Sequence, residues 1–145
     1  MMRGIRSRHG WWDRRRTIRR GAAVVETAVV APLLLTMMFG VMEFGWVFMV
    51  QQSLTNAVRE ACRTGALPGA TDNDITQRFV GAMQGAGVQV TTQMVTITHA
   101  TQGDPILTVR ASMPYSQVSL LGTVPWWSNE GKNIGAVCSM RKEGV

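Results

Sequence analysis

The sequence has few of the side chains that carry most enzyme chemistry. It contains two histidines and two cysteines in 145 residues, and one of the histidines, His9, lies among the arginines of the N-terminus. No Cys-x2-Cys or His-x3-His spacing, no Gly-x-Ser-x-Gly turn and no phosphate-binding loop occurs. A catalytic triad built from scattered residues stays open, but no motif indicates one. The sequence therefore predicts no enzyme, no metal, no cofactor and no small-molecule substrate.

Positive charge is concentrated at one end of the chain. Residues 1–20 carry eight arginines and one aspartate, a net of +7, whereas the whole chain is +6, so the other 125 residues sum to −1. An arginine cluster can bind nucleic acid, but a cluster that adjoins an apolar run is better explained by membrane topology and anionic lipid. We expect membrane lipid as a partner and no nucleic acid.

The longest apolar run extends from Ala22 to Val50 and is interrupted only by Glu26 and Glu43. As a helix it would be about 43 Å long, more than the roughly 30 Å of a bilayer core. The apolar region of a cleaved signal peptide is usually only ~7–15 residues long, so a secreted protein is the weaker alternative, although residues 14–16 are consecutive arginines. Positive charge before a first membrane helix keeps that flank in the cytoplasm. These features predict a basic cytoplasmic leader at 1–21, a transmembrane helix at 22–50 and an exported C-terminal part.

The helix is expected to continue beyond the membrane as an amphipathic extension over residues 51–66. Its apolar residues recur at helical spacing, on one face: Leu54, Ala57, Val58, Ala61 and Cys62. Gly65 and then Pro68-Gly69 are expected to end the long helix, and Pro32 is expected to kink this helix near its start in the membrane.

Residues 67–145 are predicted to form one small extracytoplasmic domain. Asp72 or Asp74 would cap a short helix with an apolar face made of Ile75, Phe79 and Met83. Strand-like runs follow at 88–99, 106–113 and 133–141, with a turn at 103–105. The predicted fold class is α+β: a long N-terminal helix, then a small antiparallel sheet of three or four strands with one short helix.

Four segments in order along the long helix resemble the TadE-like family of tight-adherence (Flp-type) pilus systems. They are RGAAVVE at 20–26, APLLL at 31–35, FGVMEFG at 39–45 and QSLTNAVREACR at 52–63. The specific part of the resemblance covers residues 21–63. Thr27 stands where family members often have Phe after the first Glu.

The resemblance implies a minor pilin-like (pseudopilin) protein of the bacterial inner membrane that takes part in pilus assembly. Its partners would be a prepilin peptidase and other pilin-like and pilus-platform proteins. Carried over to this chain, the cut would fall between Gly21 and Ala22, and the Glu26 carboxylate would pair with the new N-terminal ammonium to set subunit register. Glu26 could instead lie at headgroup level beside Arg19 or Arg20. The alternative function is an unprocessed, single-pass anchored binding module of the cell envelope, which would retain residues 1–21.

Other residues have both a functional and a purely structural interpretation. Ala23, Thr27 and Ala31 form a small-residue stripe that could pack against another helix. Cys62 and Cys138 would both be exported, which favours a disulfide over two buried thiols.

Trp126 and Trp127 either form a partner patch or pack onto the sheet. Glu43 is either functional or a solvated residue at the outer membrane edge, and His99 is expected to be a surface or packed residue.

Overall fold

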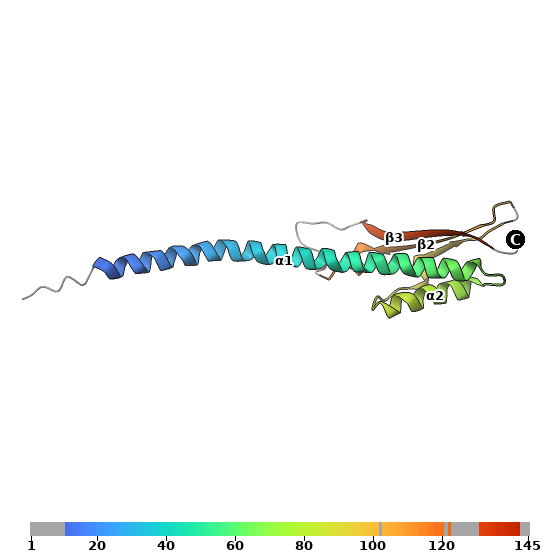
Figure 1. Cartoon of the computed structure of the whole chain (residues 1–145), viewed down its shortest axis with the longest axis horizontal. Helices are drawn as coiled ribbons and strands as arrows, with labels where there is room; N and C mark the ends of the chain where they lie inside the picture. The colour runs from blue at the N-terminus through green and yellow to red at the C-terminus, as the bar shows by residue number, and fades with distance from the viewer. Residues whose placement is uncertain (1–10, 102, 121, 123–130, 143–145) are drawn as a thin grey trace, which may run out of the picture. The chain divides into compact units, whose positions relative to one another are not determined.

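The computed structural model describes the backbone of residues 11–101, 103–120, 122 and 131–142, and side chains from Gly21 onward. The elements follow the order α1 (Trp11–Ala66), α2 (Asp72–Gly85), β1 (Val95–Thr98), β2 (Ile106–Pro114) and β3 (Asn133–Arg141), as Figure 1 labels them. Two single-turn 3₁₀ helices, Thr92–Met94 and Tyr115–Gln117, precede β1 and follow β2. The α+β class is confirmed, and the sheet has three strands.

The chain divides into two compact units, one ending at Met42 and the other beginning at Glu43. In the first unit the described side chains of α1, residues 21–42, are exposed except for half-exposed Ala31, and they include apolar ones such as Leu33 (62%). Among the described residues, the segment Gly21–Ala66 is the helix that is long and apolar enough to be a candidate membrane span. α1 continues through Pro32. One turn later, the Thr36 hydroxyl donates to the Pro32 carbonyl at 2.8 Å.

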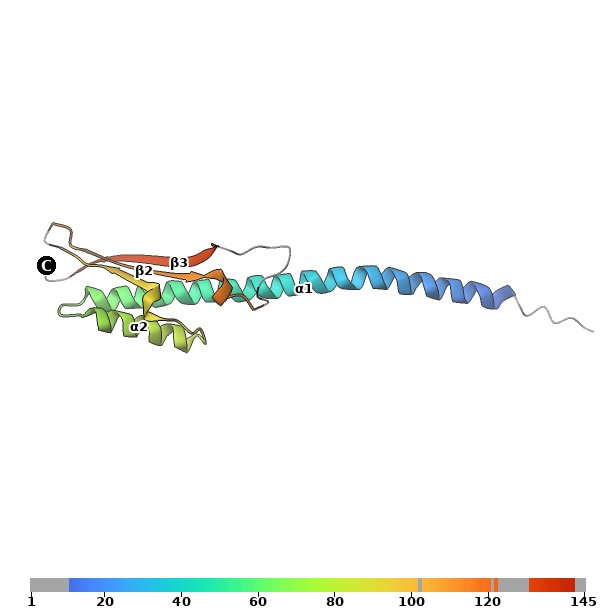
Figure 2. The ribbon, with the colours of Figure 1, turned by 180° about the vertical axis from the view of Figure 1, so that it is seen from behind.

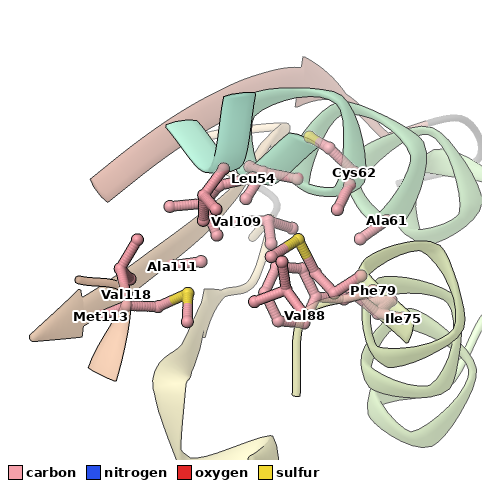
Figure 3. Close-up of a cluster of buried hydrophobic side chains, with 14 of the residues drawn as sticks. Leu54, Ala61, Cys62, Ile75, Phe79, Val88, Val109, Ala111, Met113 and Val118 are labelled. Carbon is pink, nitrogen blue, oxygen red and sulfur yellow. The ribbon is translucent and has the colours of Figure 1, made fainter. Parts of the chain in front are cut away.

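In the second unit, β2 and β3 lie alongside the C-terminal half of α1 in both views (Figures 1 and 2). All five apolar residues expected to face the domain are buried: Leu54, Ala57, Val58, Ala61 and Cys62. They share one core with the predicted apolar face of α2 and with every second residue of β2, from Leu107 to Met113 (Figure 3). Both helices therefore cover the same face of the sheet, and the other face is left largely exposed.

Gly65 has a different role from the one predicted, because α1 continues through it to Ala66. A Cβ at this position would lie 2.5 Å from Leu107 Cδ2 and 2.7 Å from Ile75 Cδ1. The absence of a side chain thus allows α1, α2 and β2 to approach closely. The glycine is required for packing and does not end the helix.

The N-cap of α2 is Thr71, not Asp72 or Asp74 as the sequence suggested. The Thr71 hydroxyl oxygen accepts from the Asp74 amide at 3.3 Å, and the Asp74 carboxylate accepts from the Thr71 amide at 2.9 Å. This reciprocal capping box satisfies two backbone donors that the first turn of a helix would otherwise leave unpaired. Asp74 is therefore the third helical residue.

The sheet is antiparallel throughout, in the order β1-β2-β3. β2 pairs with β3 over nine residues, from Ile106 opposite Arg141 to Pro114 opposite Asn133, so these two runs match their predicted strands. The predicted strand at 88–99 is too long, since β1 covers only Val95–Thr98 and the residues just before it form a 3₁₀ turn. Val and Thr favour strands, but in this segment they form a strand only where β2 provides a partner for pairing.

Candidate functional site

The predicted processing site lies inside α1. The backbone at Gly21 and Ala22 is helical, because the helix begins upstream at Trp11. Glu26 lies one turn further on, exposed, on the same apolar part of the helix. A Cβ on Gly21 would meet no described atom within 4 Å apart from its chain neighbours and the adjacent turns of the helix backbone, so the glycine is not needed for packing against the described residues.

The small-residue stripe lies on successive turns of the same helix. Ala23 and Thr27 are exposed and Ala31 is half-exposed. The Thr27 hydroxyl donates to the Ala23 carbonyl at 2.9 Å, so this polar group already has a partner on its own helix. Its use as a packing surface for another helix remains a prediction.

Glu43 holds the segment that follows β2 against α1. Its carboxylate accepts from the Tyr115 hydroxyl at 3.3 Å and from the backbone N–H of Leu120 at 3.0 Å. One turn further along α1, the Trp46 indole N–H donates to the Val118 carbonyl at 2.8 Å. We call these three hydrogen bonds the Glu43 clasp. Glu43 is half-buried and fastens a segment more than seventy positions away, so the structure favours a functional role for it over that of a solvated edge residue.

The clasp also affects the Tyr115 phenol. Burial, together with the nearby Glu43 carboxylate, raises the pKa of Tyr115 above its ordinary value of 10.0. A neutral phenol can donate to the carboxylate, which a phenolate cannot. The protonated form of Tyr115 therefore keeps the clasp closed at neutral pH.

A signal for the clasp is present in the sequence, but it is lost when the buried face of the helix is taken to begin at Leu54. The three-and-four spacing of buried residues begins upstream of Leu54, with Glu43, Trp46 and Val50 on the same face of α1. Packing of α1 against the domain thus begins at Glu43 and not at Gln51. Their partners could not be identified, because nothing local marks Tyr115, Val118 and Leu120.

The two cysteines lie together, as free thiols. Cys62 is buried on α1, Cys138 is half-buried on β3, and the Cys62 thiol donates to the Cys138 carbonyl at 3.4 Å. Burial and the adjacent Cys138 thiol raise the pKa of Cys62 to about 12. The disulfide remains a prediction, and the proximity it requires is present.

The other expected residues contribute less to a site. Trp126 and Trp127 lie outside the described residues. His99 is exposed and pairs with Asp72 at 3.1 Å, as a surface residue would. Across the part of the chain that the structure describes, no three His, Cys, Asp or Glu side chains gather where they could hold a metal ion.

Comparison with known proteins gives one informative match. Neither the curated proteins nor the solved structures contain a match to this chain. The family model described as TadE-like protein matches residues 21–63, which cover the exposed apolar part of α1 and most of the half that packs under the domain. The match indicates a protein related to pilus assembly, with one candidate N-terminal membrane helix. The resemblance to the TadE-like family, recognised from the same residues of the helix, is therefore confirmed.

Proposed function

We propose that this chain is a minor pilin-like (pseudopilin) membrane protein that takes part in assembling a tight-adherence (Flp-type) pilus or a related secretion machine. The observation that carries the proposal is the TadE-like match over 21–63. It falls on a helix with an exposed apolar first half and a second half that forms part of a small domain. A subunit that is carried into a filament by its helix needs both halves.

The proposed location is the bacterial inner membrane, with the leader 1–21 in the cytoplasm and residues 67–145 outside. The charge of +7 over the first twenty residues supports this orientation. Because packing against the domain begins at Glu43, the lipid-facing part would run from Ala22 to Met42. As a helix that part would be about 31 Å long, which fits a bilayer core of roughly 30 Å better than the whole run to Val50 does.

Cleavage between Gly21 and Ala22 by a prepilin peptidase is the proposed maturation step. It would remove the arginines and leave an ammonium at the start of the helix, one turn from Glu26. A carboxylate in a membrane is costly unless it is paired, so pairing with this ammonium, on the same or a neighbouring subunit, would set the register of subunits. Since the bond lies within α1, the peptidase would have to open the helix locally.

The proposal is tested by pilus assembly in the source bacterium after deletion of the gene. The wild-type chain should restore pili, whereas Gly21→Leu, which blocks the cut, and Glu26→Gln, which removes the charge, should not. Gly40→Leu is the matched control, because a Cβ at Gly40, as at Gly21, has open space around it among the described residues.

Loss of pili with the control variant as well would refute a specific role for Gly21. A deletion that leaves pili intact, together with an uncut protein, would instead support the alternative of a single-pass anchored binding module.

A further inference from the structure

β3 forms an edge of the sheet. It pairs with β2 on one side, and among the described residues no strand pairs with its other side. The strand is nine residues long, has no proline and pairs with β2 without a bulge. An edge of this kind has neither a proline nor a bulge, two of the devices that prevent further strands from adding.

Two backbone hydrogen bonds reveal which residues of β3 point outward. The Tyr115 amide donates to the Lys132 carbonyl and the Lys142 amide donates to the Pro105 carbonyl, each at 2.9 Å, and both pairs continue the β2–β3 register. In an antiparallel ladder the hydrogen-bonded pairs recur at every second residue. The even-numbered residues of β3 therefore bond to β2. The odd-numbered ones direct N–H and C=O to the open side: Asn133, Gly135, Val137, Ser139 and Arg141.

One of these outward groups already has a partner. The Gln51 side-chain amide on α1 donates to the Gly135 carbonyl at 2.9 Å, as expected for a carbonyl that points away from β2. Beyond Gly135, the backbone from Val137 to Arg141 makes no hydrogen bond on its outer side to any described residue. These groups make up the open edge of β3.

Positive charge surrounds the open edge. Exposed Arg110 lies opposite Val137, and Arg141 and Lys142 end the strand. The one carboxylate on the described part from β1 to Lys142 is Asp104, which accepts from the Ile106 amide at 3.2 Å. Strand addition at this edge is therefore favoured for an acidic segment.

We propose that the open edge of β3 binds an extended, acidic segment of a partner polypeptide as a fourth strand. Main-chain hydrogen bonds from Val137 to Arg141 give the affinity, and the three cations Arg110, Arg141 and Lys142 select the charge. This function is additional to the proposed pilus role and does not depend on cleavage at Gly21.

The test uses the full chain in lipid nanodiscs and a labelled synthetic peptide of alternating valine and threonine with two glutamates at each end. Hydrogen exchange should show fast amides at Val137 and Ser139 that the peptide protects, and slow amides at Ala136 and Cys138 throughout. Val137→Pro removes an outward donor and should weaken peptide binding about fivefold to tenfold, whereas Val137→Thr retains it. Arg141→Glu should weaken binding more than the control Arg63→Glu, which reverses an exposed charge on α1.

A second probe does not depend on whether Val137→Pro folds. The same peptide with N-methyl groups on the residues facing β3 should bind at least about fivefold more weakly to the wild-type chain. The proposal is overturned if the acidic peptide protects no outward amide, or if a peptide with lysines in place of the glutamates binds equally well. Protection of the outward amides that appears without peptide as the protein concentration rises would also overturn it, in favour of pairing between copies.

Discussion

Oxidation of Cys62 and Cys138 to a disulfide is expected to raise the free energy of unfolding by about 4–5 kcal/mol. The bond would connect residues 76 positions apart, from α1 to β3. For a loop of that length the chain-entropy model gives about 15 cal/mol/K, or about 4.5 kcal/mol at 25 °C. Little rearrangement should be required, because the Cys138 thiol lies beside the Cys62 thiol.

Urea unfolding of the full chain in nanodiscs, with and without diamide oxidation, measures this difference. The oxidised protein should unfold at a higher urea concentration, remain monomeric on a non-reducing gel and return to the lower midpoint after reduction. Cys138→Ser is the control, and its midpoint should not respond to oxidant. The reasoning fails if oxidation gives only intermolecular dimers, or if the monomeric disulfide forms and the midpoint does not move.

Three further predictions concern the clasp, the helix packing and the cap of α2. Glu43→Ala should lower the free energy of unfolding by about 1–2 kcal/mol, and it should also lower the pKa of Tyr115. Because Tyr115 is the chain's single tyrosine, the absorbance of tyrosinate reports this pKa directly, and an unchanged pKa would refute the clasp. Gly65→Ala should destabilise the domain, since overpacking costs roughly 1–3 kcal/mol. Gly81→Ala in α2 should stabilise the domain by about 0.5–1 kcal/mol, because a new Cβ there has open space around it. The urea midpoint should thus fall for Gly65→Ala and rise for Gly81→Ala, and two midpoints that move in the same direction would contradict this difference. Thr71 holds the pKa of Asp74 below its ordinary value of 3.8, so the capping box stabilises above that pH and its contribution is lost as the pH falls through the folded-state pKa. The melting temperature of Thr71→Ala should thus fall less than that of wild type between about pH 5 and pH 2, and equal falls would refute the cap.

The features that the sequence predicted correctly are those set by local periodicity. The burial of Leu54, Val58 and Cys62 follows from helical spacing, and the strand at 133–141 follows from alternation. Both patterns are visible within one short window of residues. The family resemblance over 21–63 has the same origin, because its motifs lie in order on one helix.

The features that the sequence missed depend on contacts between distant positions. The partners of Glu43 lie more than seventy residues away, so local spacing could indicate only that Glu43 shares the buried face. From the sequence Gly65 predicts a helix end, because a glycine that ends a helix cannot be told locally from one that allows close packing against Leu107. Helix capping by Thr71 was missed in favour of two nearby aspartates, although Thr and Asp are both common caps.

The central claim is that this chain is processed and assembled like a pilin. Intact-mass and N-terminal peptide analysis of the membrane-extracted protein, with and without a co-expressed prepilin peptidase, tests it most directly. The account predicts a mature chain that begins at Ala22 and appears only when the peptidase is present. A chain that retains residues 1–21 in both samples would contradict processing and remove the main support for the role of Glu26.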